Sequence, residues 1–155
     1  MDVTEVGWEQ TCSLREDVLG WSAGPVPGDT DIDTTHLAVF DRWPTPVAVV
    51  SYCPRPCPER PTAAATYFWA MAVGVASQHA GLGTRLINEL RERSTLARRP
   101  VMWADARTRA VDFYRACGAQ VVGEPYIDDV TGLHDHRVVF DLSSIAYSRA
   151  TTTPM

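Results

Sequence analysis

The chain has 155 residues, and its 14 basic and 19 acidic residues give a formal charge of −5. All 14 basic residues are arginine, so the sequence contains no lysine. A Walker-type phosphate loop, a protein kinase and a pyridoxal phosphate enzyme each depend on a lysine, so these three classes are excluded. The acidic balance argues against sequence-independent binding of nucleic acid, which uses clusters of basic side chains, and fits a cationic or neutral partner better.

The length and composition predict one globular domain over residues 1–145, followed by a C-terminal tail at 146–155. No apolar run approaches the roughly 20 residues that span a bilayer, so no membrane association is expected. The N-terminus shows no basic segment followed by an apolar one, so no signal peptide is expected. The four cysteines are too few and scattered for a disulfide framework, which predicts a cytoplasmic protein with reduced thiols. They are Cys12, Cys53, Cys57 and Cys117.

The N-terminal third predicts one helix, one loop and two strands. Apolar side chains at mixed three- and four-residue spacing favour an amphipathic helix over residues 8–20, ending at Gly20. Glycine, proline and aspartate are concentrated in residues 24–35, which predicts a loop. Residues 36–41 and 46–53 are short and rich in apolar and β-branched side chains, so they predict two strands joined by a turn.

The middle of the chain predicts a long loop, a central strand and a helix. The prolines within 53–62 remove backbone donors and fix φ, so this segment is expected to be a connecting loop. Residues 67–73 are apolar throughout, which predicts a strand buried on both faces. Leucines every four residues from Leu82 onward predict a helix that fades near Pro100.

The last third predicts further strands around a second helix. Residues 101–104 favour another buried strand, and residues 107–117 favour a helix that Gly118 ends. Residues 119–126 and 136–142 alternate enough to predict two more strands, linked by a turn.

Residues 78–84, with the sequence QHAGLGT, join the central strand to a helix. Gly81 and Gly83 let the backbone approach a ligand closely, and the free N–H groups and dipole of the following helix favour a phosphate. The segment is not the dinucleotide-binding fingerprint, because Leu86 stands at the third glycine position. A strand-to-helix turn that binds no ligand is the alternative.

Three motifs occur in order along the chain. They are Gln78-x-x-Gly81-x-Gly83, then Ala110-x-x-Phe113-Tyr114-x-x-x-Gly118, then Val122-Gly123-Glu124-Pro125 followed by Gly132-x-x-x-His136. Together with the order of the expected elements, they resemble the GNAT superfamily of N-acetyltransferases over roughly residues 36–142. The resemblance implies an α/β (α+β) fold with a mixed, mostly antiparallel central sheet flanked by helices.

The same resemblance implies acyl-CoA, most simply acetyl-CoA, as co-substrate, without a metal. It would lie where the central strand and its neighbour splay, with loop amides around its pyrophosphate and the strand end along its pantetheine arm. One of these amides would polarise the thioester carbonyl. The implied binding residues are Met71, Ala72 and Val73 of the strand, Gln78, His79, Ala80, Gly81, Leu82, Gly83 and Thr84 of the loop, and Arg107.

The reaction implied is attack of a neutral amine, of a small molecule or a peptide, on the thioester carbonyl. Tyr114 matches the family's tyrosine and would give its proton to the departing thiolate, since a phenol with a pKa of about 10 is protonated at neutral pH. The alternative is that Tyr114 only packs its ring in the core.

The base that takes the proton of the amine is less defined. Some relatives carry a Glu twelve residues before the tyrosine, where this chain has Met102. His136 is the first candidate because histidine titrates near neutral pH, with Glu124 as the second. Asp105, His134 or a chain of waters are the others. His136 could also be a strand-start histidine with ordinary hydrogen bonds.

The chain also departs from the family's pattern at Trp69, Val75, Arg107 and Ala119, where relatives often carry Arg, Pro, Asn and Phe. These departures keep open a second interpretation, a catalytically silent acyl-CoA-binding module that acts as a sensor or interaction protein. The resemblance also allows a homodimer through the last strands.

Two other groups of residues have alternative interpretations. Cys53 and Cys57 could form half of a zinc site with His134 and His136, or be ordinary thiols. Loop aspartates near the expected acceptor site could attract a cationic amine, or serve as solvated turn residues. These aspartates are Asp29, Asp31 and Asp33.

Overall fold

The computed structural model describes residues 1–142 and contains seven strands and three α-helices in this range. The strands are β1 (Val3–Val6), β2 (Thr35–Arg42), β3 (Thr45–Pro54), β4 (Ala65–Val73), β5 (Val101–Arg107), β6 (Gln120–Ile127) and β7 (His134–Asp141). The helices are α1 (Cys12–Leu19), α2 (Leu82–Leu96) and α3 (Val111–Ala116), with short 3₁₀ turns at Trp8–Thr11, Val75–Ser77 and Thr108–Ala110. No helix in this range is long and apolar enough to cross a membrane.

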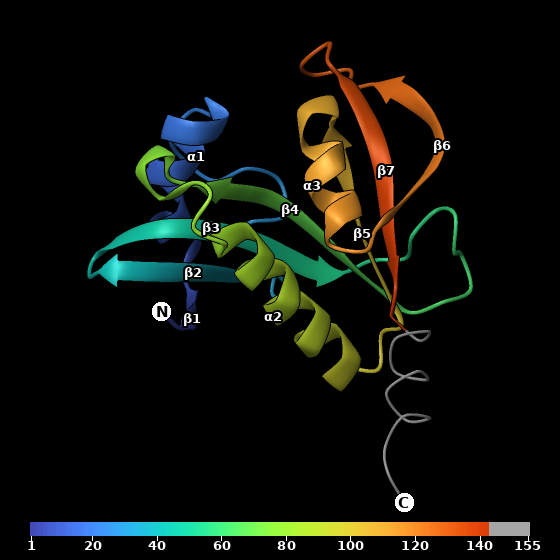
Figure 1. Ribbon diagram of the computed structural model, residues 1–155, viewed down its shortest axis with the longest axis horizontal. Coiled ribbons are helices and arrows are strands. Elements are labelled where there is room, and N and C mark those ends of the chain that lie inside the picture. The colour runs from blue at the N-terminus through green and yellow to red at the C-terminus, as the bar shows by residue number, and fades with distance from the viewer. Residues whose placement is uncertain (143–155) are drawn as a thin grey trace, which may run out of the picture. The chain divides into compact units, whose positions relative to one another are not determined.

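The strands form one sheet in the order β1-β2-β3-β4-β5-β7-β6 (Figure 1). Only β4 and β5 pair in parallel, and their register covers Ala65–Tyr67 against Val101–Trp103. The pairs β1–β2, β2–β3, β5–β7 and β6–β7 are antiparallel. The predicted fold class, a mixed and mostly antiparallel sheet flanked by helices, is therefore confirmed.

The chain divides into two compact units, of which the first comprises Met1–Pro54 and Phe68–Leu90, and the second Arg55–Tyr67 and the chain from Arg91 onward. The interpretation of residues 1–145 as one domain stays a prediction. The expected tail at 146–155 lies outside the described residues.

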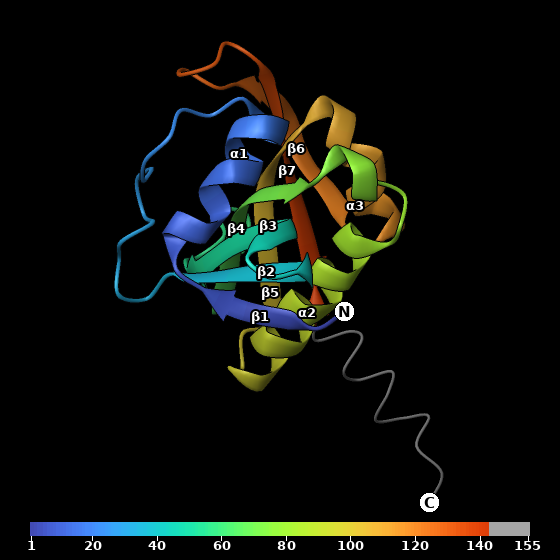
Figure 2. The same cartoon turned by 90° about the vertical axis from the view of Figure 1, so that its left-hand side faces the viewer.

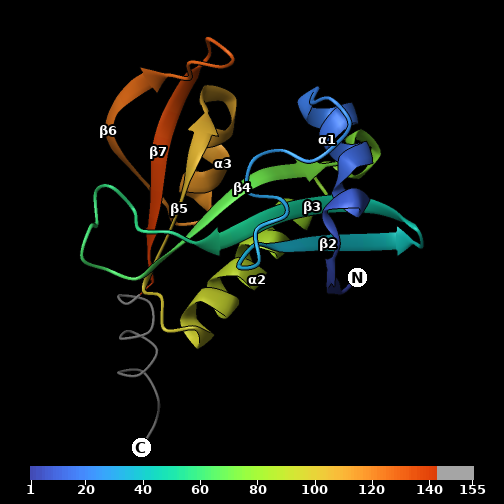
Figure 3. The same cartoon turned by 180° about the vertical axis from the view of Figure 1, so that it is seen from behind.

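In the first unit, β1, β2 and β3 form an antiparallel meander with helices on both faces. On one face, Leu14 of α1 packs in a cluster with Ala38, Val49 and Ala72. The turned views place α1 and the first part of α2 on opposite sides of β2 and β3 (Figures 2 and 3). The α2 leucines that predicted this helix are buried, as is Ile87 beside them, so the four-residue spacing identified its inner face correctly.

In the second unit, β7 lies between β5 and β6, and α3 packs beside it (Figure 1). The β5–β7 register pairs Ala106 with His136 and Arg107 with Asp135. The β6–β7 register is interrupted between Val122 and Tyr126 by a bulge. This register decides which of the expected site residues share a face of the sheet.

Two predicted elements differ from the structure, and one strand was not predicted. The expectation that β4 is buried on both faces was wrong, because Trp69, Met71 and Val73 are only half-buried while Phe68 and Ala72 are buried. The helix expected over 107–117 is shorter, since a 3₁₀ turn precedes α3. Strand β1 was not predicted, because it is only four residues long and its half-buried residues, Val3 and Val6, are separated by two exposed ones, so it shows no two-residue alternation.

Candidate active site

The end of β4 is irregular at Ala70, whose φ of 57° lies in the left-handed region. A Cβ on Gly28, in the loop before β2, would come within 3.5 Å of the Trp69 ring, and Ala72 packs with Leu14 of α1. Along the strand the burial alternates, with Trp69, Met71 and Val73 half-buried and Phe68, Ala70 and Ala72 buried. A non-glycine residue in this conformation costs about 1–2 kcal/mol, and such strain is concentrated at functional sites.

Hydrogen bonds hold the first part of the connection from β4 to α2, and the residues just before α2 are exposed. The Gly74 amide donates to the Val47 carbonyl at 2.8 Å, and Gln78 Nε2 donates to the Val73 carbonyl at 3.2 Å. His79 and Gly81 have φ values of 67° and 81°, and both are exposed. The loop therefore turns sharply and presents its backbone to solvent.

The first turn of α2 is suited to an anion. The first helical hydrogen bond runs from the Arg85 amide to the Gly81 carbonyl at 2.9 Å. The amides of Leu82, Gly83 and Thr84 precede that bond and have no acceptor within the helix, and the helix dipole adds a partial positive charge there. A Cβ on Gly81 would meet no heavy atom within 4 Å, so the glycine leaves open space on this side of the loop.

Tyr114 is on α3, in the second unit, and is 8% exposed. Its ring packs edge-on against Phe140 of β7 with centroids 6.5 Å apart, and lies 5.2 Å from the ring of Phe113. Burial, together with the nearby Cys117, raises the pKa of the phenol above its ordinary value. Tyr114 is therefore protonated throughout the neutral and mildly alkaline range.

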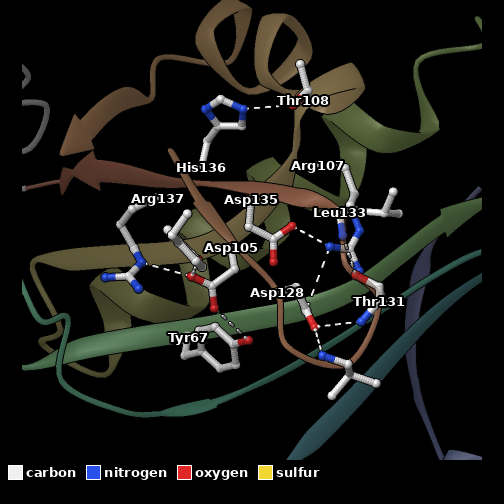
Figure 4. A network of polar contacts seen from close by, with 12 residues as sticks. Tyr67, Asp105, Arg107, Thr108, Asp128, Thr131, Leu133, Asp135, His136 and Arg137 are labelled. Carbon is white, nitrogen blue, oxygen red and sulfur yellow. Dashed lines mark hydrogen bonds and ion pairs between the residues drawn. The ribbon is translucent and has the colours of Figure 1, made fainter. Parts of the chain in front are cut away.

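His136 faces the same side of β7 as Phe140, the residue that Tyr114 contacts, because the two are four residues apart on a strand. Its Nε2 lies 2.8 Å from Thr108 Oγ1, at the turn before α3. Figure 4 shows His136 and Thr108 on one side of β7 and Asp135 on the other. The structure thus brings His136 and Tyr114 to one face of this strand.

Arg107 faces the opposite side and is already paired. Its Nη1 lies 2.5 Å from Asp135 Oδ1 and 3.7 Å from Asp128 Oδ2 (Figure 4). Burial outweighs the attraction of Arg107 and raises the pKa of Asp135. Arg107 therefore braces the hairpin between β6 and β7 against the end of β5.

The other candidate bases are in different surroundings. Asp105 accepts hydrogen bonds from Tyr67, Tyr126 and Arg137, so its carboxylate is already engaged. Glu124 lies in the β6 bulge and is exposed, and His134 is exposed at the start of β7.

The proposed zinc ligands are not assembled. Within residues 1–142, no three His, Cys, Asp or Glu side chains are grouped as a metal site. All four cysteines lie in this range and none forms a disulfide. Burial raises the pKa of the Cys57 thiol, which keeps it protonated.

A buried ion pair anchors the loop between α1 and β2. Arg15, 2% exposed, donates to both carboxylate oxygens of Asp29 at 2.6 and 2.9 Å, and to Ser51 Oγ at 2.9 Å. Since Ser51 accepts from Arg15, its hydroxyl is free to donate to His36 Nδ1 at 2.6 Å, which leaves Nε2–H to donate to the Asp29 carbonyl at 3.0 Å. Burial alone would raise the pKa of Asp29, but the hydrogen bonds from Arg15 and the Val26 amide outweigh it and hold the pKa below its ordinary value.

This network corrects the interpretation of the loop aspartates. Asp29 is buried in an ion pair with Arg15, whereas Asp31 and Asp33 are exposed. The sequence held an unused signal, because Arg15 lies three residues after Cys12 and three before Val18, on the apolar face of the helix. A charge on that face requires a buried partner.

Comparison with known proteins gives a family and a fold. Residues 8–119 match the acetyltransferase (GNAT) family. No curated protein gives a significant match.

Solved structures with this fold are remote in sequence. An acyl-CoA N-acyltransferase from Pseudomonas aeruginosa is 19% identical, with a TM-score of 0.69 over 90% of this chain and 99% of the other. An aminoglycoside 6'-N-acetyltransferase complexed with coenzyme A is 12% identical, with a TM-score of 0.71 over 92% and 97%. Arabidopsis thaliana NAA60 in complex with acetyl-CoA is 12% identical, with a TM-score of 0.73 over 92% and 98%.

Proposed function

Because the chain belongs to the GNAT acetyltransferase family, we propose that it is an N-acyltransferase that moves an acetyl or other short acyl group from acyl-CoA to an amine. The observation that carries the proposal is the exposed β4–α2 connection. It combines the family's glycine spacing with a positive φ at Gly81 and with free amides at the start of a 15-residue helix.

The pyrophosphate of acyl-CoA would bind at the amides of residues 79–84, where anions are favoured and the missing Cβ of Gly81 leaves room. From there the pantetheine arm would run back along β4, pairing with the backbone from Val73 to Met71. The thioester would then lie near Ala70, whose φ of 57° departs from strand geometry, and a backbone amide of the strand would polarise its carbonyl. Gln78, which holds the loop to Val73, would support this shape.

Tyr114 would supply the proton that the departing thiolate needs. Its burial and raised pKa keep the proton in place until sulfur develops negative charge. The phenol is therefore still protonated when the substrate binds, and it gives up its proton only when the thiolate leaves.

His136 is the preferred base for the amine. Its hydrogen bond to Thr108 fixes the ring, and an imidazole nitrogen that carries no hydrogen can accept a proton. Glu124 stays the second candidate, and Asp105 is disfavoured because three donors already engage its carboxylate. The predicted contact of Arg107 with acyl-CoA would require its pair with Asp135 to open.

The second candidate is a silent acyl-CoA-binding sensor or interaction module. Two observations favour it: Met102 is fully buried where some relatives carry a glutamate, and Arg107 is engaged by Asp135. The cytoplasmic location and the homodimer also stay predictions.

The deciding experiment measures binding of acetyl-CoA by calorimetry and release of free thiol with a panel of amines. Tyr114→Phe should lower kcat by about a hundredfold or more while acetyl-CoA binding is kept. Binding of acetyl-CoA without turnover on any amine would favour the silent module. Absence of binding would refute both candidates.

A further inference from the structure

Helix α3 ends within one turn of Tyr114. The Ala119 amide donates to the Tyr114 carbonyl at 3.0 Å, and the Gly118 amide donates at the same distance to the carbonyl of Arg115. With a φ of 105° at Gly118, these two bonds form a Schellman motif, in which a left-handed residue closes the end of the helix. The motif does not use the Cys117 carbonyl, which therefore has to be satisfied from outside the helix.

The half-buried Arg91 of α2 donates to that carbonyl. Its Nη2 lies 2.6 Å from the Cys117 oxygen, and a Cβ on Gly118 would lie 3.7 Å from the same nitrogen. A guanidinium suits this position, because charge-assisted hydrogen bonds are short and strong, and basic side chains often bind the last carbonyls of a helix. Arg91 thereby ties α2 to the end of α3, three residues after Tyr114.

The same guanidinium also contacts the ring against which Tyr114 packs. Its central carbon lies 5.8 Å from the centroid of the Phe140 ring on β7. Phe140 is 1% exposed, and Tyr114 packs edge-on against it. Arg91 thus contacts the surroundings of Tyr114 at two points, and all of these residues belong to the second unit.

The position of α3 depends on such contacts. The helix has six residues, and a helix this short is not stable through its own hydrogen bonds. A general acid has to lie within hydrogen-bond distance of the atom that it protonates, and a misplacement of about 1 Å can lower the rate about a hundredfold. A contact that fixes the end of α3 therefore also fixes the phenol of Tyr114.

We propose that Arg91 is a positioning residue of the acyltransferase, which holds Tyr114 in place through the Cys117 carbonyl and the Phe140 ring. The inference rests on the proposed acyl transfer and on Tyr114 as its acid. Loss of Arg91 should lower kcat and leave the KM for acetyl-CoA unchanged, because the amides proposed for acyl-CoA, at residues 79–84, precede it by about two turns of α2.

The first test compares substitutions of Arg91 with one on the surface of α3. Arg91→Met keeps the apolar stem but removes the charge and the donors, and it should lower kcat about tenfold or more. Arg91→Lys keeps a charge and a donor and should recover part of this loss. The matched control is Arg115→Met, because the pair of Arg115 with Asp112 is exposed and 3.8 Å long, so it contributes little. Equal kcat values for Arg91→Met and Arg115→Met would overturn the inference.

The second test separates positioning from a general loss of stability. In a Tyr114→Phe background, Arg91→Met should lower kcat little further, because the phenol that Arg91 positions is already absent. A merely structural role would lower kcat by the same factor in both backgrounds, and that result would overturn the inference. Arg91→Gln keeps a donor without the charge and should lower kcat less than Arg91→Met does. It replaces Arg91→Met in this comparison if that variant does not fold.

The outcomes separate this inference from the proposed function. If the wild-type chain acylates no amine, the proposed function fails. If the wild-type chain acylates amines and Tyr114→Phe is impaired while Arg91→Met behaves like Arg115→Met, only the role of Arg91 fails.

Discussion

Substitution of Gly81 tests whether the β4–α2 connection binds acyl-CoA through its backbone. Gly81 and Gly20 both have left-handed backbones, with φ of 81° and 70°, and a Cβ on either would meet no heavy atom within 4 Å. Gly20 only ends α1, so Gly20→Ala is a matched control for Gly81→Ala.

The expected loss of stability is the same for both variants. Alanine in this conformation costs about 1–2 kcal/mol, and its lower freedom in the unfolded chain returns about 0.4–1 kcal/mol. The net loss of about 1 kcal/mol lowers Tm by about 2–4 °C in a chain of this size.

The expected loss of affinity for acetyl-CoA differs between the two variants, because only Gly81 lies in the proposed phosphate site. A methyl group on Gly81 would enter the space that the phosphate needs and weaken hydrogen bonds to a charged ligand, each contributing about 1.5–3 kcal/mol. Losing one such bond weakens acetyl-CoA binding about ten- to hundredfold. Calorimetry measures the Kd, and thermal unfolding without ligand measures the Tm. The reasoning is refuted if Gly81→Ala binds acetyl-CoA as tightly as Gly20→Ala does.

Four further predictions concern stability and pH. Arg15→Ala should lower the free energy of unfolding by about 3–5 kcal/mol in urea titrations, because Asp29 is left buried and unpaired; a loss under 1 kcal/mol would contradict this. Because the folded pKa of Asp29 is depressed, its contribution to stability is present above about pH 4 and is lost as pH falls through the folded value, so wild type and Asp29→Asn should converge in stability in acid. Since burial raises the pKa of Tyr114, a rate profile from pH 7 to 10 should show no decline caused by its ionisation, and a decline that disappears in Tyr114→Phe would count against this. The free energy of unfolding of Ala70→Gly should lie within about 1 kcal/mol of wild type, because relief of backbone strain offsets the lost burial of the methyl group. Ala70→Val should lower the free energy of unfolding by about 2 kcal/mol or more. Equal effects of the two substitutions would show that the left-handed backbone at this position is not retained.

Local patterns in the sequence predicted the elements that depend on short-range physics. The four-residue leucine spacing located the buried face of α2, and the glycine spacing located the loop before it. The Phe113-Tyr114 motif placed the tyrosine on a helix, with Gly118 after its end. These features are set by backbone conformation and by side chains within one or two turns of each other.

The sequence by itself thus determined the fold class, the family and the loop that we propose for acyl-CoA. Only the tertiary structure decided which charges meet, because Arg15 and Asp29 are 14 residues apart and Arg107 and Asp135 are 28 apart. Such pairs depend on strand register and on which face each strand presents, and no local pattern encodes either. The same holds for β4, where an apolar run that predicted burial on both faces alternates between half-buried and buried residues from Tyr67 to Val73, because the neighbouring elements cover one face more completely than the other.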